Sequence, residues 1–208
     1  MKIFSRWEVQ TPEWIRSFFP GTFWRGNDKD KTVYLTFDDG PVPEITGWVC
    51  RELKKRNIKA TFFCVGKNAA KYPEIHALLK QEGHVTGSHT YDHLPAWKSS
   101  GKEFFKNVDK GAEAAGGDLF RPPHGQLYPW QTGKLKKRFR KIIMWDVLSK
   151  DYDNSLTAEE VFENVKRNVR PGSVIVFHDS VKARPRLEKA LPRTLDHLLD
   201  EGYKFGVL

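Results

Sequence analysis

The amino-acid sequence predicts a single-domain α/β protein built on parallel strands. Short runs rich in β-branched and aromatic residues alternate with longer segments of helical periodicity, which is typical of repeated strand–helix units. Polar residues follow directly after several of these runs, where the carboxyl ends of parallel strands place functional groups. At 208 residues, with 39% hydrophobic and 13% aromatic residues, the chain is long and apolar enough to fold around its own core.

Seven apolar runs are the expected strands. They cover residues 33–37, 60–65, 84–88, 118–121, 142–147, 173–177 and 203–207. Helices between such strands can wrap them into a closed barrel or cover both faces of an open sheet, and periodicity alone favours neither arrangement.

Helices are expected where apolar residues recur every three or four positions. Such stripes are formed by Ile45, Trp48, Val49 and Leu53, by Ile75, Leu78 and Leu79 after Pro73, and by Leu187, Leu191, Leu195, Leu198 and Leu199. A further helix is expected over 157–169, because Thr157 and Glu160 have the spacing of a capping box.

Charge and cysteine content restrict the function only loosely. The net charge of +9 favours anionic partners, but basic stretches such as 54–59 and 134–141 are more simply explained as solvated helix faces. No module that enters a groove or stacks on bases is recognisable, so we expect no nucleic-acid partner. The two cysteines, Cys50 and Cys64, have no metal-binding or redox spacing and are expected to be reduced core residues.

The amino-terminal segment has two interpretations. Charged residues and Pro12 interrupt its apolar character, so we expect no export signal here, and no apolar run is long enough to cross a bilayer. We therefore expect a cytoplasmic protein, with residues 1–30 as an extension that packs on the main domain. The segment is rich in aromatic residues: Trp7, Trp14, Phe18, Phe19, Phe23 and Trp24. Packing across the bottom of the domain is the favoured explanation, and peripheral contact with the inner membrane face is the alternative.

The residues after the expected strands point to metal chemistry. Asp38 and Asp39 follow the first strand, and two adjacent carboxylates there need a cation or donors to offset burial, although either could simply cap the next helix. His89 and His93 have i, i+4 spacing, which on a helical turn would place both imidazoles on one face to bind one ion. An HxxxH spacing alone is weak evidence for a metal site. A carboxylate and a third histidine, His178, at other strand ends strengthen the metal interpretation.

Five segments in order give a more specific indication. They are TFDDGP (36–41), SHTYDH (88–93), RPPHG (121–125), WDVLSKDY (145–152) and VIVFHD (174–179). With these segments the chain, from residue 31 to its end, resembles the polysaccharide deacetylases of carbohydrate esterase family four. The resemblance implies a distorted (β/α) barrel with about seven parallel strands, a catalytic domain over 31–208, and one divalent metal ion, usually Zn²⁺.

The resemblance also implies a role for each site residue. Asp39, His89 and His93 would bind the metal. The general base would be Asp38, oriented by Arg121, and the general acid would be His178, paired with Asp151. The backbone N–H of His124 would face the developing oxyanion, and Val176 and Tyr152 would line the acetyl pocket. The expected reaction is removal of an N-acetyl group from an amino sugar in a glycan or glycoconjugate.

Three positions depart from the commonest family pattern. His124 replaces an aromatic residue, Leu148 an aspartate and Tyr152 a tryptophan, which leaves the substrate more open than the reaction. A cytoplasmic enzyme would meet a lipid-linked, nucleotide-linked or imported sugar, so a phosphate-linked glycan at the membrane is one expected partner. The alternatives are hydrolysis of a non-sugar amide or imide, an inactive carbohydrate-binding relative and, on charge alone, an anion or nucleic-acid binder. The sequence does not indicate the oligomeric state.

Overall fold

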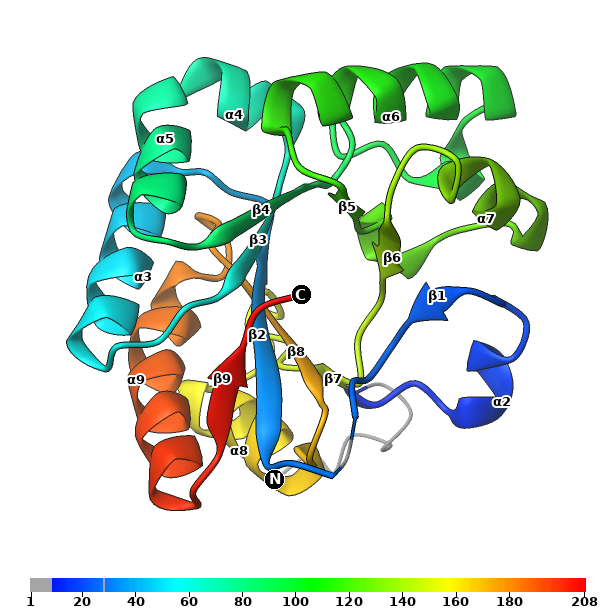
Figure 1. Ribbon diagram of the computed structural model, residues 1–208. Coiled ribbons are helices and arrows are strands. Elements are labelled where there is room, and N and C mark those ends of the chain that lie inside the picture. Colours follow the sequence, from blue (N-terminus) through cyan, green and yellow to red (C-terminus); the bar gives the residue numbers. More distant parts are fainter. Residues whose placement is uncertain (1–8, 28) are drawn as a thin grey trace.

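The parallel strands form one curved sheet in the computed structural model, which describes residues 9–27 and 29–208 (Figure 1). The strands within that part of the chain are β1 (Thr22–Phe23), β2 (Thr32–Asp38), β3 (Thr61–Cys64), β4 (Val85–Ser88), β5 (Leu119–Phe120), β6 (Lys141–Ile143), β7 (Val147–Leu148), β8 (Val174–His178) and β9 (Lys204–Gly206). Their order is β1-β6-β5-β4-β3-β2-β8-β7, and β9 pairs with β2.

The expected fold class, a distorted barrel, is confirmed, and the seven expected strands correspond to eight of the nine observed. The run 142–147 forms two strands, because β6 pairs with β5 whereas β7 pairs with β8 on the opposite side. Only residues 144–146 join them, so this segment links the two sides of the barrel. The ninth strand, β1, is too short for a periodic signal, and it pairs with β6.

Helices pack outside the strands, as Figure 1 shows for α3, α5 and α9. The α-helices are α2 (Glu13–Arg16), α3 (Pro43–Lys55), α4 (Gly66–Lys71), α5 (Pro73–Gln81), α6 (Gly101–Ala115), α7 (Pro129–Leu135), α8 (Ala158–Asn168) and α9 (Arg184–Asp200). All four expected helices are present, and the Thr157–Glu160 capping box is formed in both directions. Helices α2, α4, α6 and α7 are not anticipated from the sequence.

The core lies between the sheet and these helices. Phe37 stacks on Phe62 with ring centroids 4.9 Å apart and also contacts Phe177, so side chains from three neighbouring strands pack together. Both cysteines are buried and free, as expected. In the part of the chain that the structure describes, no helix is long and apolar enough to span a membrane.

The described part of the amino-terminal segment is tied to the barrel at the amino ends of the strands. Arg16 of α2 donates a 2.7 Å hydrogen bond to the buried carboxylate of Asp146, whose own N–H donates to the first residue of β8. Trp24 is buried, whereas Trp14 and Phe18 are exposed. Trp7 lies outside the described residues.

Candidate active site

A pocket of about 360 Å³ opens at the carboxyl ends of the strands. It is lined by Asp38, Asp39, His89, His93, His124, Trp145, Leu148, Tyr152, Val176, His178 and Lys182. All three expected metal ligands and both expected proton-transfer residues are among them. Arg121 and Asp151 lie behind this lining, fully buried.

The turn after β2 holds Asp39 in an unusual backbone conformation. Asp39 has a φ of 81°, a left-handed value that non-glycine residues rarely adopt. The next residue, Gly40, donates its N–H to the carboxylate of Asp179, and Thr46 donates its hydroxyl to the same carboxylate. A Cβ at Gly40 would lie 2.0 Å from the Asp179 carboxylate, so only glycine fits there. Asp179 therefore positions the turn that carries Asp39.

Asp39, His89 and His93 offer ligand atoms that all lie within 4.8 Å of one another. The His93 Nε2 is 3.3 Å from the Asp39 Oδ1. The expectation that 89–93 forms a helical turn was wrong: the segment is a loop in which Thr90 and His93 both have positive φ. Left-handed residues fold the loop back on itself and bring the imidazoles together, with ring centroids 5.0 Å apart.

The chemistry of this trio fits a divalent metal ion. The Nδ1 of His89 lies 2.8 Å from the carbonyl oxygen of Arg121, a contact that fixes the proton on Nδ1 and leaves the Nε2 lone pair for a ligand bond. Burial lowers the pKa of His89 to about 4, so its imidazole is neutral near pH 7. Burial opposes ionisation of Asp39, but the surrounding histidines outweigh it and lower the pKa of the carboxyl.

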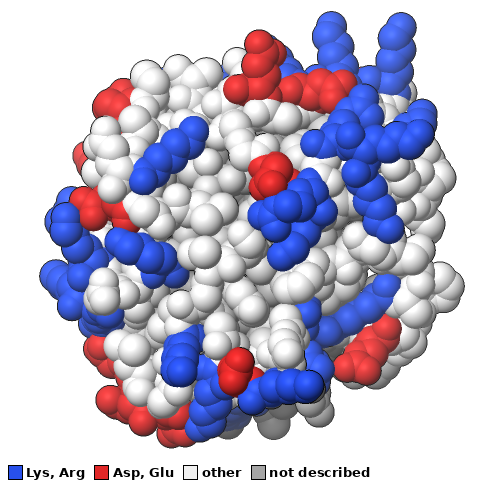
Figure 2. All heavy atoms as spheres, viewed as in Figure 1, with Lys and Arg blue, Asp and Glu red and all other residues white. Residues whose placement is uncertain are grey.

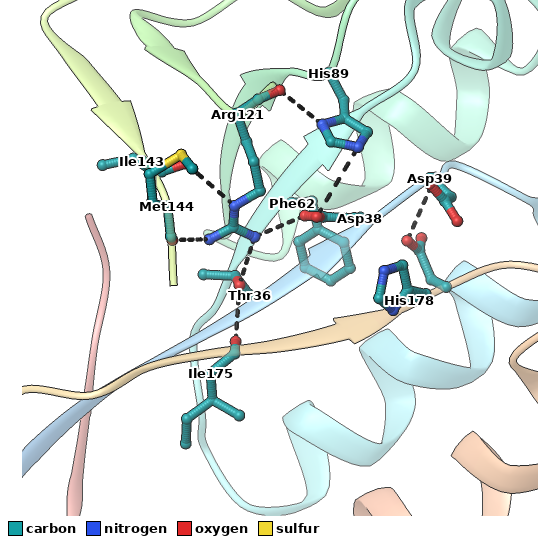
Figure 3. Close-up of polar contacts among 12 residues, drawn as sticks. Thr36, Asp38, Asp39, Phe62, His89, Arg121, Ile143, Met144, Ile175 and His178 are labelled. Carbon is teal, nitrogen blue, oxygen red and sulfur yellow. Dashed lines mark hydrogen bonds and ion pairs between the residues drawn. The ribbon is translucent and has the colours of Figure 1, made fainter. Parts of the chain in front are cut away.

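Asp38 lies next to the His89 ring and is held by Arg121 (Figure 3). The guanidinium donates a 2.7 Å hydrogen bond to Asp38 Oδ1, and the free Oδ2 is 4.0 Å from the His89 Nε2. Arg121 also donates to Thr36 and to the carbonyls of Ile143 and Met144. These last two carbonyls lie where the chain passes from β6 toward β7, so the arginine occupies the break between those strands.

His178, the last residue of β8, is paired with Asp151. Its Nδ1 is 2.7 Å from one carboxylate oxygen, and its backbone N–H donates to the other at 2.8 Å. Burial opposes the charged imidazolium, but the charge of Asp151 and its hydrogen bond outweigh burial and raise the pKa of His178 to about 9. The pair therefore provides a protonated imidazole at neutral pH, with Nε2 as its remaining donor.

The expected substrate-binding residues also border the pocket. His124 has a φ of 57° and packs edge-on against His93, with ring centroids 4.8 Å apart, but it is not part of the metal-binding trio. Tyr152 packs edge-on against the His178 ring at 4.9 Å. Sequence reasoning missed Trp145 and Lys182 as lining residues. Trp145 lies within a recognised segment, whereas nothing in the sequence around Lys182 indicated its place.

Together, these features define a barrel protein with a histidine–carboxylate pocket at the carboxyl ends of its strands, and comparison with known proteins gives its family. Residues 25–140 match the family model described as polysaccharide deacetylase. A peptidoglycan-N-acetylglucosamine deacetylase of Bacillus cereus is 34% identical over 183 residues, which are 85% of this chain and 66% of that protein. A chitooligosaccharide deacetylase of Azorhizobium caulinodans is 32% identical, over 74% of this chain and 77% of that one.

Solved structures agree with the sequence comparison. The Bc1960 peptidoglycan N-acetylglucosamine deacetylase, in complex with an N-hydroxybenzamide, superposes with a TM-score of 0.85 at 32% identity over 94% of both chains. A mutant of BA3943, described as a pseudoenzyme of carbohydrate esterase family four with restored enzymatic activity, has a TM-score of 0.79 at 26% identity, over 91% of this chain and 70% of that one. The chain belongs to the polysaccharide deacetylase family.

Proposed function

We propose that this protein is a metal-dependent deacetylase, with Zn²⁺ as its ion, that removes the N-acetyl group from an amino sugar in a glycan. The observation that carries the proposal is the arrangement of one pocket. Asp38 with Arg121 lies on one side of the metal-binding trio, and His178 with Asp151 lies close by at the neighbouring strand end. N-acetylglucosamine in peptidoglycan or a chitooligosaccharide, named for the relatives, is the proposed sugar.

The proposed mechanism begins with Asp38 as general base. A divalent ion held by Asp39, His89 and His93 would polarise the acetyl carbonyl and make a nearby water more acidic. Because Arg121 donates a hydrogen bond to Asp38 Oδ1, Oδ2 is the oxygen proposed to accept a proton from the attacking water. The oxygen of the water forms a bond to the acetyl carbonyl carbon, and the π electrons of the carbonyl group move to the carbonyl oxygen. The backbone N–H of His124 is the proposed donor to that oxygen.

His178 completes the reaction as general acid. Its Nε2 proton passes to the sugar nitrogen as the C–N bond breaks, which releases acetate and the free amine. Asp151 keeps the imidazole charged and oriented until that step. Val176 and Tyr152, with Leu148 beside them in the lining, form the proposed apolar pocket for the acetyl methyl.

Two alternatives share the same pocket. A non-sugar amide or imide could be the substrate, since the changes at His124, Leu148 and Tyr152 alter the lining. An inactive carbohydrate-binding relative is the other, because pseudoenzymes occur among the structural neighbours. The retained Asp38, Arg121 and His178 argue against inactivity, because binding of a metal alone requires none of them.

A comparison of substrates tests the proposal. Zn²⁺-loaded protein is incubated with chitotetraose, with peptidoglycan glycan strands and with a panel of small non-sugar amides and imides, and released acetate and amine are measured. The proposal requires acetate from at least one glycan, with the Asp38→Asn variant as the blank. Turnover confined to the non-sugar compounds would support the first alternative, and an occupied metal site with no turnover would support the second.

Peripheral contact with a membrane or a phosphate-linked glycan is a separate part of the proposal. Trp14 and Phe18 form an exposed edge-on pair, which supports an interfacial role. Removing residues 1–25 would also remove β1, so the sharper test is liposome flotation of Trp14→Ala/Phe18→Ala against the full chain. Flotation that is absent in the full chain would exclude the contact. The cytoplasmic location and the boundary at residue 30 stay predictions, open to cell fractionation and to a truncation series.

A further inference from the structure

A second cavity, of about 660 Å³, lies on the outer surface between α6 and α7, away from the residues that line the catalytic pocket. Its lining, called here the α6–α7 groove, is Gly101, Lys102, Phe105, Lys106, Asp109, Trp130, Lys134 and Arg138. Figure 2 shows lysine and arginine side chains gathered over this region, at the upper right of the view. Nothing in the proposed reaction uses these residues.

The groove contains an aromatic surface that is exposed and yet held in place. Trp130 is 55% exposed. It stacks on Tyr128 at an interplanar angle of 13°, and its ring lies so close to α6 that a Cβ at Gly101 would be 2.9 Å away. The ring centroids of Phe105 and Trp130 are 6.1 Å apart. An indole fixed in this way can stack against the apolar face of a sugar ring without losing side-chain freedom.

Three lysines around Trp130 have no acidic partner among the described residues. The one carboxylate of the lining, Asp109, is engaged by Arg138. Within the described residues Lys102, Lys106 and Lys134 form no ion pair, although Lys134 lies 5.6 Å from the centroid of the Trp130 ring. Lys102 and Lys106 are one helical turn apart, where like charges repel and destabilise the helix slightly. An anion bound between them would relieve that repulsion.

We propose that the α6–α7 groove is an accessory binding site for an anionic glycan, in which a sugar ring stacks on Trp130 and carboxylates pair with Lys102, Lys106 and Lys134. The inference rests on the proposed function, since it assigns a charged glycan to the same enzyme. Two chain segments connect the groove to the catalytic pocket, and a hydrogen bond joins them. The indole N–H of Trp97, which follows His93, donates to the carbonyl of Leu127, three residues after His124. The segments that carry His93 and His124 therefore lead directly into α6 and α7, the two walls of the groove.

Binding is measured by isothermal titration calorimetry with peptide-free peptidoglycan glycan strands, whose lactyl groups carry free carboxylates, and with neutral chitotetraose. Lys102→Glu/Lys134→Glu should weaken binding of the charged strands about tenfold or more, and Trp130→Ala should weaken it several-fold. The matched control is Lys137→Glu/Lys189→Glu, which changes the net charge equally at two exposed lysines outside the groove. The two lysine double variants should deacetylate neutral N-acetylchitotetraose as the unaltered protein does, because that oligomer has no carboxylate for the lysines to bind.

The outcomes separate this inference from the proposed function. Groove variants that bind the charged strands as tightly as the control would overturn the accessory site, even in an active enzyme. A protein that binds the strands through the groove but releases no acetate would keep the accessory site and overturn the proposed reaction. A single-stranded oligonucleotide bound through the groove more tightly than the glycan strands would also overturn the assignment to a glycan.

Discussion

Arg121 and Asp38 form a buried ion pair beneath the pocket, with the guanidinium nitrogen 2.7 Å from the carboxylate oxygen. The arginine comes from the end of β5 and the aspartate from the end of β2. Because the same guanidinium also binds the carbonyls of Ile143 and Met144, it joins three parts of the barrel. The pair therefore has both a structural and a chemical consequence.

The structural consequence is a large loss of stability when Arg121 is replaced by Met. The substitution leaves the Asp38 charge buried without its partner, which costs about 3 to 5 kcal/mol of unfolding free energy. Urea denaturation followed by circular dichroism measures it. Arg140→Met is the matched control, because Arg140 pairs with Asp118 at an exposed site where such pairs contribute about 0 to 1 kcal/mol. Equal losses in the two variants would contradict the structural role.

The chemical consequence concerns Asp38 itself. Asp38→Asn keeps an oxygen that accepts the Arg121 hydrogen bond but removes the base, so turnover should fall by about a hundredfold or more while the metal stays bound. His89→Ala removes a ligand and should lose both the metal and activity. Metal analysis and acetate release on the same samples check the contrast. Full activity in the Asp38 variant would show that another group is the base.

The pair of His178 and Asp151 predicts a pH dependence. The proposed mechanism requires the acid form of His178, and the raised pKa of about 9 means that this form persists to that pH and is lost above it. Asp151→Asn removes the charge that raises the pKa, so the alkaline limb of activity should move down toward the ordinary histidine value of about 6.5. A pH profile of kcat/KM measures the shift.

The control for that profile is Asp153→Asn, a nearby aspartate in the same loop that contacts Lys150 instead of the histidine. Its alkaline limb should stay where the unaltered protein has it. If Asp151→Asn also left the limb in place, some other group would set it.

A glycine beside the proposed metal ligand Asp39 gives a fourth prediction. Gly40→Ala places a Cβ against the Asp179 carboxylate, which must move and shift the turn that carries Asp39. Metal affinity should fall about 10- to 100-fold, the usual effect of disturbing groups that orient a ligand. Gly133→Ala in α7 is the control, since a Cβ there meets nothing within 4 Å. Competition with a metal chelator measures both, and an unchanged affinity in Gly40→Ala would contradict the role of Asp179.

The gathering of the candidate site residues at one end of the sheet was predictable for one physical reason. In parallel α/β folds the carboxyl ends of neighbouring strands meet, so residues after each apolar run come together even when they are far apart in sequence. The conformation of the loops was not predictable in this way. His93 reaches Asp39 through left-handed residues, which no periodicity encodes, and Lys182 enters the lining from a loop without a motif. The division of 142–147 into two strands depends on pairing with distant partners and on Arg121.

The central claim is that acetate release depends on one ion bound by Asp39, His89 and His93. Titration of metal-free protein with Zn²⁺, with acetate release from a glycan followed at each addition, tests it most directly. The account predicts no activity without metal and a linear rise that ends at about one equivalent per chain, absent in His89→Ala. Activity in the metal-free protein equal to that of the loaded protein would contradict it.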